Sequence, residues 1–147
     1  MVLGAIQPSA EQLGIQLLPV QARTPTDVPD ALALARSIQA DGLVVLADRV
    51  FGASREVIVE FAERHKLPTA FQLRDYVDAG GLLSYGPSEQ DFYIPVQQPS
   101  LFQMVINAKT AKALGVTIPQ SLLLRADQVI EWGPGICAQI VPNSGAL

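Results

Sequence analysis

Short apolar runs alternate along the chain with longer stretches in which apolar residues recur every three or four positions. The clearest run is 42–47, Gly-Leu-Val-Val-Leu-Ala, which is continuously apolar and β-branched at its centre. Such a run is typical of a strand covered on both faces. Helical spacing of apolar residues follows on either side of it, over 27–40 and 55–66. Strands that alternate with helices predict an α/β fold, with a parallel Rossmann-like sheet and helices on both faces.

The remaining elements are predicted from short apolar runs and from the residues that start and stop helices. A helix is expected to end near Leu13, with Gly14 as its stop. Asn107 is the expected N-cap of a helix that Gly115 terminates. The inward faces expected of the first two long helices contain Leu34, Ile38 and Val57, among others. Further strands are predicted at 15–20, 67–71, 82–85, 101–106 and 129–130, and another short helix at 119–124.

Composition limits the classes of partner. The 147 residues are 49% hydrophobic and 16% charged, with a net charge of −4, so the apolar excess needs a core or a face that a partner covers. The basic residues are scattered, which argues against nucleic acid or an anionic membrane as a partner. No apolar run is long enough to span a bilayer, and Met1–Ile6 lacks the features of a signal peptide.

The residues that enzymes use for catalysis are sparse and far apart in the sequence. His65 is the only histidine and Cys137 the only cysteine, so neither a disulfide nor a cysteine-based metal site is expected. His65 is predicted to lie at a helix C-terminus, where a cation is favourable. No glycine-rich phosphate loop is present. These observations predict no enzyme, no metal and no cofactor; a flavodoxin-like enzyme, which would require a bound flavin, has the weakest support.

Four motifs of the chain carry a resemblance to a known family. They are 67–69 (Leu-Pro-Thr), 74–86 (Arg-Asp-Tyr-Val-Asp-Ala-Gly-Gly-Leu-Leu-Ser-Tyr-Gly), 95–99 (Pro-Val-Gln-Gln-Pro) and 105–119 (Val-Ile-Asn-Ala-Lys-Thr-Ala-Lys-Ala-Leu-Gly-Val-Thr-Ile-Pro). Together they closely resemble the extracytoplasmic substrate-binding proteins of bacterial ABC transporters, in the branch similar to the tryptophan/tyrosine-type binding proteins. The resemblance extends over about 13–131.

The resemblance implies a single lobe of a type I periplasmic-binding-protein clamshell. Residues 1–131 would form mainly the C-terminal lobe, with the crossover helix missing near 87–95 and a loose tail at 132–147. The first strand of that lobe would precede Ser9, and Met1–Ile6 would be a short substitute for it. The implied function is to bind a small amino-acid-like, carboxylated or aromatic solute by clamshell closure, outside the cytoplasm, and to deliver it to an ABC permease.

Five residues near the ends of predicted strands are the candidate solute-binding residues. Asp48 could accept a hydrogen bond from a ligand amine or simply cap the next loop. Phe71 could stack on a ligand ring or pack in the core, as aromatic residues on strands usually do. Arg74 could hold a ligand carboxylate or pair with a neighbouring aspartate. Ser84 and Tyr85 are the best cleft candidates, although Tyr85 could also belong to the hinge.

A second hypothesis belongs to a different class of function. The chain could be a stand-alone sensor or a self-associating interaction domain derived from such a lobe. Its apolar composition and the missing first lobe would then favour a homodimer through the exposed cleft face.

Overall fold

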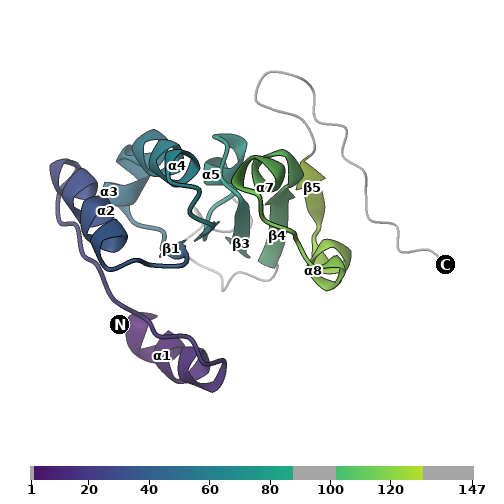
Figure 1. Ribbon diagram of the computed structural model, residues 1–147, viewed down its shortest axis with the longest axis horizontal. Helices are drawn as coiled ribbons and strands as arrows, with labels where there is room; N and C mark the ends of the chain where they lie inside the picture. Colours follow the sequence, from purple (N-terminus) through teal and green to yellow (C-terminus); the bar gives the residue numbers. More distant parts are fainter. Residues whose placement is uncertain (1, 88–101, 131–147) are drawn as a thin grey trace, which may run out of the picture.

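A five-stranded sheet forms the centre of the computed structural model, which describes residues 2–87 and 102–130 (Figure 1). The strands follow the sheet in sequence order, β1-β2-β3-β4-β5. Their bounds are β1 Leu43–Val45, β2 Thr69–Phe71, β3 Leu83–Pro87, β4 Phe102–Asn107 and β5 Gln128–Ile130.

Three of the four strand pairs are parallel, as the alternation of strands and helices predicts. β1 pairs with β2, β2 with β3 and β4 with β5 in parallel. The exception is β3 with β4, which pair antiparallel with Pro87 opposite Phe102. The sheet is therefore mostly parallel and mixed α/β, and the predicted fold class is confirmed.

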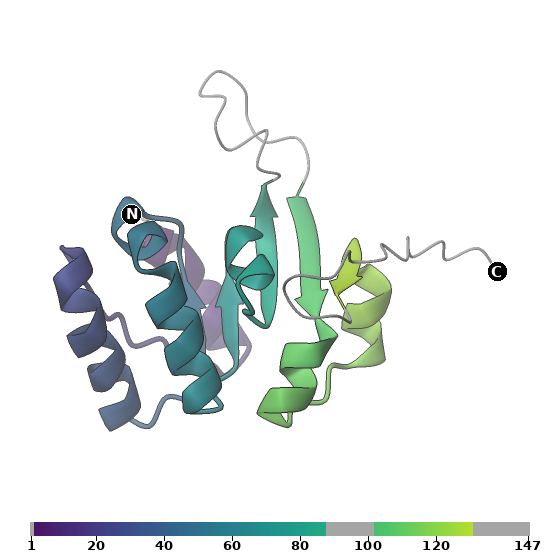
Figure 2. The same ribbon diagram turned by 90° about the horizontal axis from the view of Figure 1, so that it is seen from above.

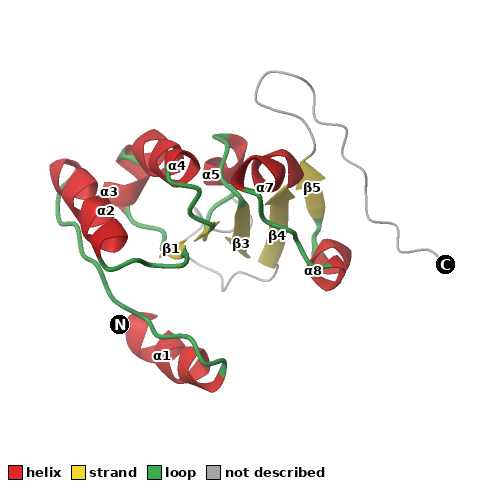
Figure 3. Ribbon diagram, in the orientation of Figure 1, coloured by secondary structure: helices red, strands yellow, loops and turns green. Residues whose placement is uncertain are grey.

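Helices lie on both sides of this sheet (Figures 1 and 2). The helices α2, α4, α5 and α7 line one side, whereas α1 and α8 lie on the other (Figures 1 and 3). The helix bounds are α1 Val2–Gln12, α2 Val28–Ser37, α3 Arg49–Ala53, α4 Arg55–Arg64, α5 Asp75–Asp78, α7 Ala108–Leu114 and α8 Gln120–Arg125, with the 3-10 helix η1 at Pro25–Asp27.

The main core lies between the sheet and α2, α4 and α5. Val45 and Phe71 are neighbours in the β1–β2 register and point into this core. They pack with buried residues of the helices, namely Val28, Leu32, Ile58, Val59 and Tyr76. Each large apolar side chain buried in this way stabilises the fold by about 1.5–3 kcal/mol.

Local rules correctly predict several helix ends. The Asn107 side chain accepts a hydrogen bond from the Thr110 N–H (3.0 Å), so it caps α7 as expected. Gly115 ends α7 and Gly14 follows α1, both with φ of +71°. A left-handed residue at this position is glycine's usual role after a helix.

The predicted strand at 15–20 is absent, and this is the main error of the sequence-based topology. Residues 15–20 have no regular structure, and the proposed substitute strand at Met1–Ile6 belongs largely to α1. The only strand that pairs with β1 in the described residues is β2. A strand requires a neighbour to receive its backbone hydrogen bonds, so the apolar run at 15–20 remains irregular.

Some inward faces were also wrongly predicted. The run 42–47 forms only the three-residue strand β1, and Val44 at its centre is 62% exposed instead of covered. In α2 the buried residues are Val28, Leu32 and Ala35, while Leu34 and Ile38 are exposed. Val57 of α4 is likewise exposed. The predictions of a missing crossover near 87–95 and of a tail at 132–147 lie outside the described residues.

Candidate functional site

The carboxyl ends of β1, β2 and β3 meet along one edge of the sheet, because these strands are parallel. Gln72 follows β2 directly, and its Oε1 accepts a hydrogen bond from the backbone N–H of Ala47, 2.9 Å away. Gly86 of β3 passes so close to Gln72 that an added Cβ would overlap the Gln72 carbonyl oxygen. These contacts hold the three strand ends together. We call the surface formed by Asp48, Gln72, Tyr85 and Phe102, with the buried Gly86 beneath it, the strand-end surface.

Asp48 lies at this surface and caps a helix. It is the N-cap of α3, and its Oδ1 accepts a hydrogen bond from the Val50 N–H at 2.8 Å. The sequence left two roles open for Asp48, a contact to a ligand amine and a cap, and the structure supports the cap. Its second carboxylate oxygen has no hydrogen-bond partner among the described residues, so the same side chain still has an acceptor to offer a solute.

An exposed aromatic pair lies beside Gly86. The rings of Tyr85 and Phe102 are stacked, with centroids 5.6 Å apart and planes inclined by 28°. They are 55% and 52% exposed, respectively. The Tyr85 ring is therefore accessible to solvent, and Phe102 joins it from the antiparallel strand β4.

Phe71 and Ser84 lie in the interior and not on a cleft wall. They are opposite each other in the β2–β3 register, and each is only 2% exposed. The Phe71 ring stacks on Tyr76 in the main core, with ring centroids 4.6 Å apart. Both residues share the helix-covered face of the sheet, so the structure corrects their assignment as solute contacts and favours the core interpretation of Phe71.

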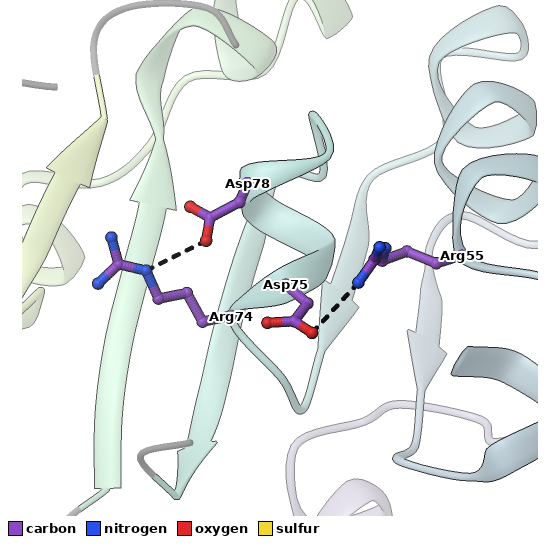
Figure 4. A network of polar contacts seen from close by, with 4 residues as sticks. All are labelled: Arg55, Arg74, Asp75 and Asp78. Carbon is purple, nitrogen blue, oxygen red and sulfur yellow. Dashed lines mark hydrogen bonds and ion pairs between the residues drawn. The ribbon is translucent and has the colours of Figure 1, made fainter. Parts of the chain in front are cut away.

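Arg74 is already engaged in a local ion pair (Figure 4). Its Nε lies 3.4 Å from Asp78 Oδ2, one helical turn away, and both side chains are substantially exposed. In the same region Arg55 Nη1 lies 3.1 Å from Asp75 Oδ2. Exposed pairs of this kind contribute about 0.2–1 kcal/mol. The alternative role of Arg74, as the partner of a neighbouring aspartate, is therefore the one seen.

Two buried polar atoms near the Arg55–Asp75 ion pair have no hydrogen-bond partner among the described residues. They are the Tyr76 hydroxyl and the Arg55 Nε. Burial raises the pKa of Tyr76, and the nearby Arg55 guanidinium partly opposes this shift. The phenol therefore remains a neutral hydrogen-bond donor at physiological pH.

The described residues contain no cluster of three or more histidine, cysteine, aspartate or glutamate side chains that could hold a metal ion. None of the described helices is both long enough and apolar enough to cross a membrane.

Comparison with known proteins gives structural matches only. No protein-family model matches the chain, and neither does any curated protein sequence. Among solved structures, a conserved domain protein from Vibrio cholerae O1 biovar El Tor has a TM-score of 0.71 and 25% identity. An ABC domain from Streptococcus pneumoniae, solved in complex with L-Trp, has a TM-score of 0.74 and 24% identity. Each match covers 87% of this chain.

A third similar structure is the ligand-free, open form of a substrate-binding protein with adhesive properties from Clostridium difficile, with a TM-score of 0.62 and 20% identity over 80% of this chain. The chain has a periplasmic-binding-protein-like fold. It spans about half the length of the three proteins, covering 49%, 50% and 45% of them. This periplasmic-binding-protein-like fold accounts for the mostly parallel sheet with helices on both sides.

Sequence reasoning missed Gln72 and Phe102 as parts of the strand-end surface, and it missed the close packing of Gly86 against Gln72. Gln72 was detectable, since it is a polar residue directly after an apolar strand, the same signal that selected Asp48. Phe102 was not, because its position beside Tyr85 depends on the antiparallel β3–β4 pair.

Proposed function

We propose that this chain forms one wall of a solute-binding site in a substrate-binding protein of a bacterial ABC importer. The observation that carries the proposal is a structural match. An ABC domain solved with L-Trp and a substrate-binding protein match 87% and 80% of this chain, which corresponds to about half of the length of each. The exposed polar and aromatic strand-end surface supports it, because ligands of open α/β sheets bind at the carboxyl ends of the strands. The role is binding and delivery to a permease outside the cytoplasm, without catalysis.

The strand-end surface favours a small solute with an amine and an apolar or aromatic group. The second carboxylate oxygen of Asp48, which has no partner in the described part of the chain, is an acceptor for an amine. The stacked rings of Tyr85 and Phe102 offer an exposed face to a flat or apolar side chain. Arg74 pairs with Asp78 through its Nε, and this neighbouring negative charge would weaken its attraction for a solute carboxylate, so we assign it a secondary role.

One wall alone should bind such a solute weakly. Small-molecule sites usually bury 70–90% of the ligand, and a single open surface cannot do so. If the dissociation constant exceeds the solute concentration tenfold, the solute stabilises the chain by less than about 0.1 kcal/mol. We therefore expect millimolar solute to leave the melting temperature unchanged.

The decisive experiment is an amide NMR titration of this chain with L-Trp, other amino acids and small carboxylates. We expect chemical-shift changes at millimolar solute confined to residues near Asp48, Gln72 and Tyr85. Tyr85→Ala should reduce these changes, whereas Val57→Ala, at an exposed position of α4, should not.

Two outcomes would contradict the proposal. The absence of any shift across the whole panel would remove the binding role. Shifts that appear on the helix-covered side instead would relocate the site. A clear rise in melting temperature at millimolar solute would contradict only the expectation of weak binding.

A further inference from the structure

The Gln72 side chain takes the place of a backbone acceptor at the end of the sheet. The Leu43 N–H donates to the carbonyl oxygen of Pro68, just before β2, at 2.9 Å. The hydrogen bonds of parallel strands are evenly spaced, so the same pattern further along would join the Ala47 N–H to the Gln72 carbonyl oxygen. That carbonyl oxygen instead lies against Gly86. The Ala47 N–H donates to the Gln72 side-chain oxygen, 2.9 Å away.

This bond fixes the orientation of the Gln72 amide. Because a backbone N–H requires an acceptor, the atom that faces Ala47 is the oxygen Oε1, and the nitrogen Nε2 retains two N–H donors. No described residue accepts a hydrogen bond from Nε2, and this nitrogen is not among the buried polar atoms without a partner, so solvent reaches it. A Cβ on Gly86 would lie 3.1 Å from the Gln72 Cγ, so the stem of the side chain is also held in place. Gln72 therefore offers a preorganised donor at the strand-end surface.

An acceptor accompanies this donor. Asp48 follows Ala47 directly in the chain, so its carboxylate and the Gln72 amide come from two strand ends that the Ala47 bond holds together. One carboxylate oxygen of Asp48 caps α3, and the other has no hydrogen-bond partner within 2–87 and 102–130. The arginines Arg55 and Arg74 are each engaged by an aspartate. Gln72 and Asp48 therefore supply a neutral donor and a charged acceptor to the same surface.

We propose that Gln72 is a specificity-determining residue of the solute site, with Nε2 donating to a carbonyl oxygen of the solute while Asp48 accepts from the solute's amine. This inference rests on the proposed solute-binding function. The two roles together favour an amine with a carbonyl group on the adjacent carbon, as in an α-amino acid and its esters and amides. A carboxamide N–H binds a carboxylate and a neutral carbonyl alike, whereas the fork of an arginine matches a carboxylate. The site therefore recognises the carbonyl oxygen and not the negative charge.

A matched pair of ligands tests this role by amide NMR titration. L-Tryptophan methyl ester and tryptamine both carry an indole and, at about pH 6, one protonated amine, but only the ester has a carbonyl oxygen. We expect the ester to bind about two- to tenfold more tightly, which is the effect of one added hydrogen bond. One proton of the Gln72 side-chain amide should move downfield with the ester and not with tryptamine. L-Tryptophan should produce the same shift, since its carboxylate oxygen is an equivalent acceptor.

Two glutamine-to-glutamate variants separate the donor from the rest of the side chain. Gln72→Glu keeps an oxygen for the Ala47 N–H but removes both Nε2 donors, so it should lose the preference for the ester over tryptamine. Gln120→Glu adds the same charge at an exposed position, the first residue of α8, and should keep the preference. Circular dichroism checks that both variants are folded, and the comparison of ligands in the wild type does not depend on either variant.

The outcomes separate this inference from the function on which it rests. Equal binding of the ester and tryptamine by the wild type would overturn the inference. So would a preference that survives Gln72→Glu, or a Gln72 shift that appears with L-tryptophan but not with the ester. In each of these cases a solute still binds, so the proposed function stands. Absence of binding by all three compounds would refute the proposed function and this inference with it.

Discussion

Gly86→Ala is the most direct test of how the strand ends are held together. The added Cβ would overlap the Gln72 carbonyl oxygen and lie 3.0 Å from the Gln72 carbonyl carbon. Both are backbone atoms, so a side-chain rotation cannot relieve the clash. Overpacking of this kind costs about 1–3 kcal/mol. A displaced Gln72 would also weaken its bond to the Ala47 N–H, which is worth about 0.5–1.5 kcal/mol.

We therefore expect Gly86→Ala to lower the free energy of unfolding by about 2–4 kcal/mol. Denaturant titration followed by circular dichroism measures this change. In a domain of this size each kcal/mol lowers the melting temperature by about 2–4 °C. The amide resonance of Ala47 should move as well, because its acceptor is displaced.

Gly52→Ala is the matched control. Gly52 lies within α3, and a Cβ there would meet no atom within 4 Å. Alanine is a better helix former than glycine, so this variant should be neutral or more stable by about 0.5–1 kcal/mol. If Gly86→Ala proved as stable as Gly52→Ala, the close approach of β3 to Gln72 would be refuted.

Three further predictions concern stability. Asn107→Ala removes the cap of α7 and should cost about 1 kcal/mol by denaturant titration, whereas Asn107→Ser should restore most of it. Ile58→Ala leaves a cavity in the main core and should cost about 2–5 kcal/mol; a smaller cost would mean that the core closes around it. Partial burial, then the Arg36 and Arg64 charges, lowers the pKa of His65, so its neutral form is favoured in the folded state. The free energy of unfolding is therefore not reduced by His65 above its unfolded pKa of about 6.5. It decreases as the pH falls through that value and the lower folded pKa, because the unfolded chain binds the proton more readily. His65→Gln should flatten the stability profile between about pH 7.5 and 5.5, and an unchanged profile would exclude His65 as the cause.

The sequence predicts best the features that local chemistry determines. Asn107 and Gly115 mark the ends of α7 because a cap and a left-handed residue act within one helical turn. The predicted position of His65 at the end of α4 is also right, and partial burial, then the neighbouring arginines, lowers its pKa there. The run at 15–20 has strand-like composition, but the strand depends on a neighbour that composition does not reveal.

The candidate site shows the same limit. Asp48 was predicted because it follows a strand, and the same signal would have found Gln72. Tyr85 was expected at the end of its strand but lies in the middle of β3, level with Gln72 in the register. Which of Ser84 and Tyr85 faces outward depends on the register with Phe71. The strands β1 and β2 have only three residues each, too few for alternation to identify their buried face. Ser84 was therefore assigned to the wrong side, the core role that the sequence favoured for Phe71 is the one seen, and Tyr85 is exposed.

The run 42–47 shows where a local pattern stops being informative. A continuously apolar run indicates a strand covered on both faces, yet among the described residues the face of Val45 is buried while Val44 is 62% exposed. The run therefore predicted the strand β1 correctly, but its composition could not tell which of its side chains the rest of the fold covers.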